Sequence, residues 1–494
     1  MMSFLPFELH PYWSLGIQIA YTLFIAAICF RALVDTRSVS KTLAYLLLIV
    51  FVPLLGAIFY LSFGINYRKR KIYNKKLKID ERLKQDFIRN IRHLETVLTE
   101  QPYPELKRFR QTRSLLSNPL LGSDPCMPNW ELKVLQNGEE KFPRLIAEME
   151  AARHHIHIQY YIFENDGIGN TIKELLIKKA AEGVVVRFIY DDFGSMRIRK
   201  AFIRELRDNG VKAYPFNRIR LIGLANRINY RNHRKIVVID GRISFVGGIN
   251  VADKYINSDS SPLFWRDTHL LINGYSTFAL QQVFLADWNF CSGESLEMND
   301  VYFPLEQEWP PMDNFAQIIS SGPDSEKPNI LYALVNAINS AQEEILLTTP
   351  YYIPDITLQE SLVLAALSGK AVKLLVPGQG DSRLVTIASH SFFEELLQAG
   401  VEIYLYRKGF VHAKTFVIDK TLAGIGTANL DTRSFDLNFE VTAVIYDKEV
   451  ASELAADFYN DLEDADRLER RRWKIRSRWQ IILEKIIRLI SPFM

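Results

Sequence analysis

The feature that most restricts the fold of this chain is an internal duplication between residues 129 and 465. Three pairs of segments are similar and occur in the same order: 157–166 with 347–356, 180–189 with 366–375, and 205–216 with 395–406. Short apolar runs typical of strands alternate with helical patterns, at Val184–Tyr190, Ile236–Asp240, Val372–Val376 and Thr415–Asp419. We therefore expect two α/β repeats, each a mixed sheet flanked by helices, that together form one active site.

Each repeat carries the same short motif. The first copy consists of His233, Lys235, Asp240, Gly247 and Asn250. The second copy consists of His412, Lys414, Asp419, Gly426 and Asn429, at the same spacing. A single His-x-Lys pair is a poor signal, but two copies matched at five positions predict a shared catalytic site.

The period of a β-strand explains the spacing within the motif. A histidine and a lysine two residues apart point to the same face, where an imidazole and an ammonium can converge on one phosphate. The aspartates, Asp240 and Asp419, have the opposite parity and are expected to anchor the strand end. The glycines permit a tight turn that returns Asn250 and Asn429 to the site, as donors to phosphate oxygens.

Two histidines are sufficient for transfer at a phosphodiester. One attacks phosphorus and forms a phosphohistidine, while the other protonates the leaving alkoxide and then deprotonates the incoming alcohol. Each needs a carboxylate that fixes its tautomer, and Asp267 follows His233 as Glu440 follows His412. We expect these sequential pairs to form. The shorter Asp267 would then hold His233 rigidly as the nucleophile, leaving His412 as the general acid. The lysines supply positive charge, so no metal or cofactor is required.

Two uncharged runs near the N-terminus, Pro11–Phe30 and Thr42–Tyr67, predict two transmembrane helices, the second kinked at Pro53. Two buried core helices are the disfavoured alternative. No Lys or Arg precedes the first run. Three such residues lie between the runs (Arg31, Arg37 and Lys41), and seven follow the second (Arg68, Lys69, Arg70, Lys71, Lys75, Lys76 and Lys78). This asymmetry predicts a cytoplasmic catalytic part in a multi-pass protein of the bacterial inner membrane.

Two further segments combine basic and apolar residues. The tail has seven basic residues from Arg467 to Arg478, followed by Trp479, Ile482, Leu483, Ile486, Ile487 and Ile490 at helical spacing. It predicts an amphipathic helix on an anionic membrane, with packing on the protein's own body as the alternative. The first repeat has an insertion at 218–231 that either dips into the headgroup layer or forms a plain surface loop.

These patterns divide the chain into five parts. We expect two transmembrane helices at 1–67, a basic juxtamembrane helix and linker at 68–128, the repeats at 129–310 and 311–465, and the amphipathic helix at 466–494. The three cysteines, Cys29, Cys126 and Cys291, offer neither a disulfide framework nor a zinc site.

The paired motifs resemble the HKD motifs of the phospholipase D superfamily over residues 130–465. The N-terminal runs, "WRDTHLLING" at 265–274 and "NLDTRSFDLNFE" at 429–440 resemble bacterial cardiolipin synthases more specifically. That resemblance implies phosphatidyl transfer from one phosphatidylglycerol to another with release of glycerol. It also implies a nucleophile in the N-terminal motif. Gly248 departs from the Ser of many members, while Thr427 occupies the equivalent place; the backbone N–H is expected to serve a phosphate there instead.

Other functions use the same residues. A hydrolytic phospholipase D would take water as acceptor, and phosphatidylethanolamine or another alcohol could replace the second phosphatidylglycerol. A membrane-tethered nuclease is disfavoured by the apolar accessories, so we expect phospholipid partners and no nucleic acid. A non-enzymatic lipid-binding scaffold is disfavoured because both motifs are intact.

Overall fold

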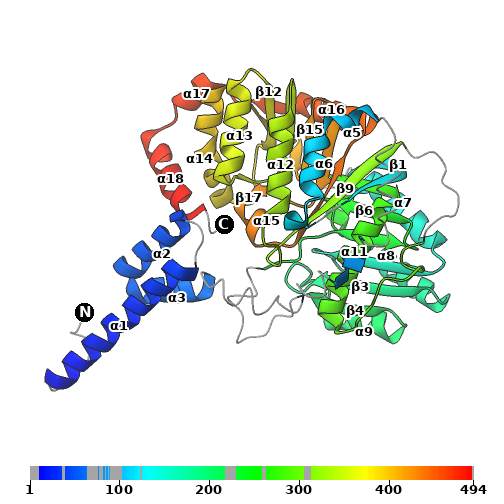
Figure 1. Cartoon of the computed structure of the whole chain (residues 1–494), viewed down its shortest axis with the longest axis horizontal. Coiled ribbons are helices and arrows are strands. Elements are labelled where there is room, and N and C mark those ends of the chain that lie inside the picture. Colours follow the sequence, from blue (N-terminus) through cyan, green and yellow to red (C-terminus); the bar gives the residue numbers. More distant parts are fainter. Residues whose placement is uncertain are drawn as a thin grey trace. The chain divides into compact units, whose positions relative to one another are not determined.

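The computed structural model describes residues 11–35, 39–63, 76, 82–83, 85–86, 88, 103–122, 125–216, 230–258, 263–304 and 313–491. The chain divides into two units, one of residues 1–74 with 222–229 and the other of residues 75–221 with 230–494. The described part of the first unit contains the N-terminal helices, and the second unit contains both repeats (Figure 1).

Helix α1 (Pro11–Asp35) covers the first uncharged run and has 25 residues. It is the one described helix that is long and apolar enough to cross a membrane. The predicted second spanning helix, kinked at Pro53, is not confirmed, because that run makes two shorter helices, α2 (Val39–Phe51) and α3 (Pro53–Phe63). Pro53 has no N–H to donate, and its ring clashes with the preceding turn.

The break between α2 and α3 is sharper than a kink, and the two helices pack against each other. A Cβ at Gly56 would overlap the backbone carbonyl of Leu48, so this contact requires glycine. The Tyr60 hydroxyl on α3 donates to Asp35 Oδ2 at the end of α1, at 3.0 Å. The three helices therefore form one small apolar bundle.

The second unit is built on a 15-stranded sheet in which the two repeats contribute strands in the same order. The strands of the first repeat, from the centre outward, are β1 (Cys126–Gln136), β8 (Thr268–Gly274), β6 (Ile243–Gly247), β5 (Ile236–Ile239), β2 (His155–Tyr160), β3 (Val185–Asp191) and β4 (Lys212–Phe216). Those of the second are β9 (Asn314–Ser321), β18 (Glu440–Ile445), β16 (Leu422–Gly426), β15 (Thr415–Ile418), β10 (Glu344–Thr348), β12 (Ala371–Pro377) and β13 (Glu402–Tyr406), with β19 (Ala465–Arg467) at the edge.

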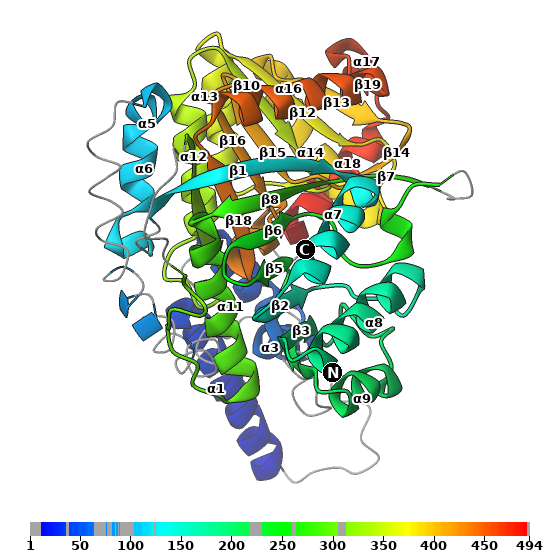
Figure 2. The same cartoon turned by 90° about the vertical axis from the view of Figure 1, so that its right-hand side faces the viewer.

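The repeats join where β1 pairs antiparallel with β9. Figure 2 shows β1 crossing the middle of the unit, with one repeat on either side. Strand β6 also lies against β16 and β18, so the sheet folds back and brings the centres of the two repeats together. Strands β2, β3 and β4 of the first repeat and β10, β12 and β13 of the second pair in parallel, and the other neighbouring strands, including β19 at the edge, pair antiparallel. The predicted duplication and the four predicted strands are confirmed.

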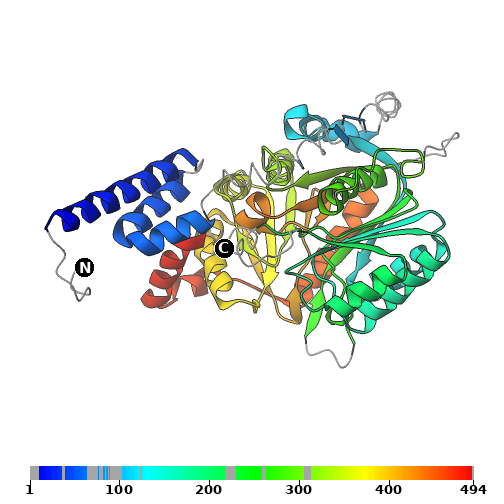
Figure 3. The same cartoon turned by 90° about the horizontal axis from the view of Figure 1, so that it is seen from below.

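Strand β2 shows how the sequence places helices on both faces of the sheet. Ile156, Ile158 and Tyr160 join an apolar core with α7 (Asn137–Ala151), α8 (Gly167–Ala181) and α9 (Lys200–Asp208). On the alternate face, His157 stacks on Phe284 of α11 (Ser276–Ser292). In Figure 3 the teal-to-green helices α7, α8 and α9 of this repeat and the yellow-green helices of the other lie on different sides of the unit.

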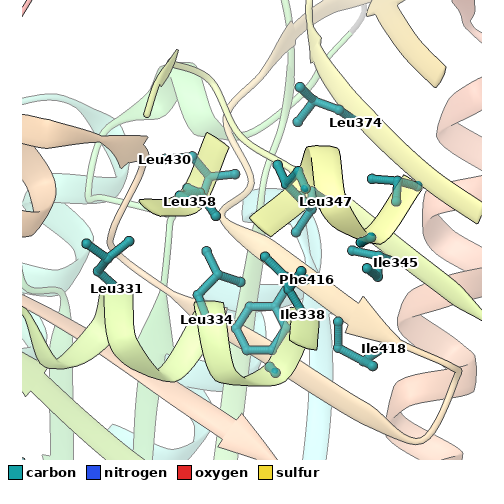
Figure 4. Close-up of a cluster of buried hydrophobic side chains, with 14 of the residues drawn as sticks. Leu331, Leu334, Ile338, Ile345, Leu347, Leu358, Leu374, Phe416, Ile418 and Leu430 are labelled. Carbon is teal, nitrogen blue, oxygen red and sulfur yellow. The ribbon is translucent and has the colours of Figure 1, made fainter. Parts of the chain in front are cut away.

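The second repeat has the corresponding helices α12 (Asn329–Ser340), α13 (Ile356–Leu367), α14 (Arg383–Ala399) and α16 (Lys448–Glu463). Its core is centred on Phe416, which lies among side chains of α12 and β10 (Figure 4). Phe416 pairs across the strands with Gly424, which has no side chain to obstruct the ring. The first repeat reverses this arrangement, with Val237 opposite Phe245. At this pair of facing positions, each core is filled by one large and one smaller residue.

Part of the predicted linker belongs to the second unit, which contains both repeats. Helices α5 (Pro104–Arg108) and α6 (Arg110–Leu116) bury Leu106, Phe109 and Leu116 in the core of the second repeat. Of the basic run 68–78, the structure describes Lys76, whose ammonium lies 3.1 Å from Asp287 Oδ1 and 2.7 Å from Asp324 Oδ2. The rest of that run is outside the described residues.

Candidate active site

The two motifs meet between the repeats. His233 and Lys235 directly precede β5, and His412 and Lys414 directly precede β15. Each histidine segment is held by the other repeat. The His233 amide donates to Phe439 O at 3.0 Å, and the His412 amide donates to Arg266 O at 2.7 Å. A parallel pair of short strands, β7 (Phe264–Arg266) and β14 (Gly409–Val411), makes the second junction (Figure 2).

The carboxylates pair with the histidines across the two repeats. His233 Nδ1 lies 3.0 Å from Glu440 Oε2, and His412 Nδ1 lies 2.7 Å from Asp267 Oδ2. The sequential pairing of His233 with Asp267 and of His412 with Glu440 is therefore wrong. The cause is the exchange at β7 and β14, which places the residue after Arg266 beside the other repeat's histidine. Neither half could assemble a complete dyad alone.

The surroundings of the two Nδ1 atoms differ. His233 Nδ1 also lies 3.1 Å from Thr427 O, so both of its described neighbours are acceptors. This environment fixes the proton on Nδ1 and leaves the Nε2 lone pair available for attack. His412 Nδ1 lies between the acceptor Asp267 and the Lys414 ammonium, a donor 2.8 Å away. Its proton can therefore sit on either nitrogen.

The catalytic groups are almost closed off from solvent. His233 and His412 are 9% and 8% exposed, and Lys235 is fully buried. Lys235 Nζ donates to His233 O at 2.8 Å, and Lys414 Nζ donates to His412 O. Such burial strengthens electrostatic stabilisation of a phosphate between the motifs.

Burial also controls protonation. Desolvation lowers the pKa of His412 to about 3, with Lys414 adding to the effect, and it lowers the pKa of His233 against the attraction of Glu440. Desolvation lowers the pKa of Lys235 to about 8 and that of Lys414 to about 7. Burial alone would raise the pKa of Asp267, but Lys414 and His412 together bring it below its usual value. Both imidazoles are thus neutral near pH 7.

The two motif aspartates hold the backbone and lie outside the chemistry. Asp240 accepts hydrogen bonds from the amides of residues 153–155, and Asp419 accepts them from residues 342–344. Both have positive φ angles, 52° and 49°, just after their strands. Asp419 also forms an ion pair with Arg108. Each aspartate fixes the end of the strand that directly follows its histidine and lysine.

The motif asparagines are built into the turns that follow. Asn250 Oδ1 accepts from the Ile162 amide at 3.1 Å, and its Nδ2 donates to the Tyr255 hydroxyl. Asn429 Nδ2 donates to Asp431 at 3.2 Å. Each side-chain amide has two hydrogens and these contacts use one, so a phosphate contact stays a prediction.

Gly248 and Thr427 occupy the equivalent position in the two motifs, but they contact the neighbouring carboxylate in different ways. The Gly248 amide donates to Thr268 O at 2.9 Å, so the expected use of this N–H for phosphate is wrong. A Cβ at Gly248 would overlap the Asp267 carboxylate, which explains the missing serine. Thr427 Oγ1 donates to Glu440 Oε2, and Asn438 Nδ2 donates to Glu440 Oε1 at 3.2 Å.

Three residues near the site were not identified from the sequence. The Tyr161 ring lies 4.9 Å from the His233 ring, and the Trp265 ring lies 5.2 Å from that of His412. Tyr161 belongs to the duplicated Tyr-Tyr segment, which could have indicated it. Lys141 is buried and donates to Ile249 O at 2.8 Å, behind the first motif. A lysine within a helical pattern gives no signal of this kind.

Of the insertion at 218–231, the structure describes Tyr230 and Arg231. The Arg231 guanidinium lies 4.0 Å from the centre of the Phe193 ring. The rest of the insertion, including its basic and apolar residues up to Asn229, is outside the described residues.

Known proteins resemble this chain over most of its length. The family described as "Cardiolipin synthase, PLD-like domain" matches residues 145–269 and 334–462, and the family described as "Phospholipase_D-nuclease N-terminal" matches residues 20–64. The chain is 41% identical to a cardiolipin synthase of Geobacillus sp. (strain WCH70) over 479 residues, covering 97% of this chain and 94% of the relative. It is 40% identical to the cardiolipin synthase of Alkalihalophilus pseudofirmus, covering 98% and 95%.

A solved structure shares the fold. The phosphatidylserine synthase of Haemophilus influenzae Rd KW20 superimposes with a TM-score of 0.57 at 15% identity, covering 78% of this chain and 100% of that one. At this level of identity the likeness concerns the arrangement of strands and helices and not the substrate.

Proposed function

We propose that this chain, which belongs to the family of cardiolipin synthases with phospholipase D-like domains, transfers a phosphatidyl group from one phosphatidylglycerol to another. The products are cardiolipin and glycerol. The observation that carries the proposal is the crossed pair of dyads, His233 with Glu440 and His412 with Asp267, beside two buried lysines. Near-full-length identity of about 40% to cardiolipin synthases supports the substrate class.

The reaction proceeds in two displacements at phosphorus. In the first, His233 Nε2 bonds to the phosphorus of the donor lipid, the bond to the glycerol headgroup oxygen breaks, and His412 supplies the proton that the leaving alkoxide takes. In the second, His412 takes the proton from a hydroxyl of the acceptor phosphatidylglycerol. That oxygen bonds to phosphorus, the bond to His233 breaks, and cardiolipin leaves.

His412 must carry a proton in the first displacement, although burial favours its neutral form. Lys414 Nζ lies 2.8 Å from His412 Nδ1 and has a pKa of about 7, so it can share a proton with that imidazole. An anionic phosphate close to both groups favours their protonated forms. Lys235 neutralises the phosphate from the other side. The proposal therefore needs no metal, since the two ammonium groups supply the positive charge.

The N-terminal helices place this chemistry at a membrane. Helix α1 forms one span, and we propose that α2 and α3 lie in the same bilayer as a bent second segment, in a multi-pass protein. No Lys or Arg precedes α1, whereas the basic residues of 31–41 and 68–78 follow it. The catalytic unit lies on the basic, cytoplasmic side whether the bent segment crosses the bilayer or returns to the same face.

A single incubation distinguishes the candidate reactions. Purified full-length protein in vesicles would receive phosphatidylglycerol labelled in its headgroup glycerol, as the only phospholipid. Transfer releases one labelled glycerol for each cardiolipin, and the cardiolipin keeps one label. A hydrolytic phospholipase D, the second candidate, would release labelled glycerol together with phosphatidic acid. Phosphatidic acid as the main product would contradict the proposed transferase.

A further inference from the structure

The C-terminal helix α18 (Arg478–Ile490) has one face fixed to the second repeat, where it packs on α14. Ile487 is buried against this repeat. Glu484 is 4% exposed and accepts a hydrogen bond from Arg476 Nη1 at 2.5 Å. The Arg488 guanidinium lies 4.5 Å from the centre of the Phe392 ring and donates to Ser391 O at 3.3 Å. These contacts determine which face of α18 points outward.

The preceding helix α17 (Arg470–Lys474) is attached to the same surface. Its Trp473 is 6% exposed, and the Trp473 ring lies 5.7 Å from that of Phe393 and 5.3 Å from that of His390. Trp473 therefore belongs to the core of the second repeat. The two helices form one rigid extension of this repeat, which we call the C-terminal ledge (residues 470–490).

The outward face of the ledge is apolar. Its exposed side chains are Ile475 (81%), Trp479 (81%), Ile482 (46%), Leu483 (46%), Ile486 (56%) and Leu489 (72%). From Trp479 onward they lie at positions i, i+3, i+4, i+7 and i+10, the spacing of one helical stripe. A continuous apolar stripe of this kind on a soluble surface marks a contact with a partner.

The charge around the stripe identifies the partner. The exposed basic residues of the ledge are Arg470, Arg471, Arg472, Lys474, Arg478, Lys485 and Arg488. Its acidic residue, Glu484, is buried and neutralised by Arg476. An apolar stripe with an exposed tryptophan and a cationic border fits the headgroup layer of a bilayer that contains anionic lipid. A protein partner would need matching acidic and apolar groups, whereas such a bilayer offers both.

We propose that the C-terminal ledge is a second membrane contact, which lies on an anionic bilayer and holds the second repeat against it. The sequence offered two alternatives for the tail, packing on the protein's own body and binding to a membrane. One face of α18 then does the first and the other face does the second. This inference does not depend on the reaction, because it concerns a surface remote in sequence from both motifs. It follows from side-chain exposure and charge alone.

The position of the stripe can be measured in the full-length chain. Leu483→Cys carries a polarity-sensitive fluorophore in proteoliposomes of phosphatidylcholine with phosphatidylglycerol, and nitroxide-labelled lipids serve as quenchers. Gln480→Cys, an exposed polar position of α18 outside the apolar stripe, is the matched control. Labelled parent chain gives the background from the three native cysteines. We expect shallow nitroxides to quench the label at 483 strongly and the label at 480 much less. In vesicles of pure phosphatidylcholine, quenching of both labels should be weaker.

Two outcomes would overturn the inference. Quenching of the 483 label by aqueous acrylamide and not by lipid would place the stripe in water. Protection from both quenchers would show that protein covers it, whether another part of this chain or a second copy.

A second experiment measures activity in the double variant Leu483→Ser with Ile486→Ser. Its apparent KM on anionic vesicles should rise several-fold, while its turnover of a short-chain soluble phosphatidylglycerol should stay unchanged. The control is Leu364→Ser with Leu367→Ser on α13, a helix with exposed apolar residues but no Lys or Arg. Equal losses in the two variants would also contradict a specific role of the ledge.

Discussion

The two halves of the active site are built to the same plan but differ around their carboxylates. In one half, Glu440 receives hydrogen bonds from Thr427 and Asn438 and faces His233. In the other half, Asp267 faces His412, and Gly248 provides the space that its carboxylate occupies. Two side chains therefore donate to the longer glutamate, while the shorter aspartate accepts from the backbone amide of Thr268 at 2.8 Å.

This difference separates the duties of the two histidines. The Nδ1 atom of His233 has acceptors as its described neighbours, which fixes one tautomer and suits a nucleophile. The Nδ1 atom of His412 has Lys414 as a close donor, which suits a group that gives and takes a proton. His233 thus remains the nucleophile because both described neighbours of its Nδ1 atom are acceptors. The sequence had predicted the same role for a different reason, that Asp267 would hold His233. A duplicated motif does not imply duplicated roles.

Removal of either imidazole should have the largest effect. His233→Ala and His412→Ala should each lower turnover at least about a hundredfold, because one loses the nucleophile and the other the proton donor. His154→Ala, at an exposed position, is the control and should retain full activity. The measurement is cardiolipin formation in vesicles, with thermal unfolding to check folding. More than a hundredth of the wild-type rate in either variant would contradict a single site with two histidines.

The division of roles predicts where the covalent intermediate forms. In His412→Asn the first displacement is slowed by loss of the acid, but the second lacks its base, so any phosphatidyl group that is transferred should remain on the other imidazole. Acid quenching during turnover, digestion and mass spectrometry should find the adduct on His233. The reciprocal variant His233→Asn should give no adduct. An adduct on His412 would reverse the comparison and leave the two-displacement mechanism intact.

Gly248 and Thr427 test the two ways of holding a carboxylate. Gly248→Ala should displace Asp267 from His412, and a shift of this kind can cost about a hundredfold in rate. Thr427→Val removes one donor from Glu440 and leaves Asn438, so a loss of about tenfold is expected, equivalent to roughly 1.4 kcal/mol.

Thr427→Ser is the control for that second variant, since it keeps the hydroxyl. The loss in Thr427→Val should appear in turnover beyond any change in unfolding temperature, because the Val441 amide also loses its acceptor there. Equal rates in Gly248→Ala and wild type would show that Asp267 has more freedom than this account allows.

Much of the architecture could be predicted because it repeats. The two copies of the motif and their strands predicted the two α/β repeats. The crossed dyads could not be predicted, since each carboxylate follows its wrong partner in sequence and only the pairing of β7 with β14 exchanges them. The break at Pro53 was underestimated, because a proline indicates a bend but not that Gly56 permits close packing of the two halves. The tail pattern indicated an amphipathic helix without showing that Ile487 and Glu484 face inward.

The smallest expected effect is a shift in pH dependence that separates the two lysines. Both must be protonated to neutralise the phosphate, so kcat/KM should fall as pH rises through their pKa values, about 7 for Lys414 and about 8 for Lys235. Asp267 is the charge that most raises the pKa of Lys414, and Glu440 is the charge that most raises the pKa of Lys235. Asp267→Asn should therefore move the lower alkaline step to more acidic pH, whereas Glu440→Gln should move the upper one.

The two alkaline steps come from lysines that interact, so neither step belongs to one lysine alone. The test is therefore which step moves in each variant, measured in complete profiles of kcat/KM against pH on short-chain phosphatidylglycerol. Each variant also loses turnover at every pH, because its histidine loses a charged partner, but a uniform loss leaves the profile in place. His412, with a pKa near 3, contributes no step above pH 5 in the free enzyme. Profiles that keep the wild-type midpoints in both variants would mean that the lysines are not the groups that titrate, and the electrostatic difference between the halves would lose its functional meaning.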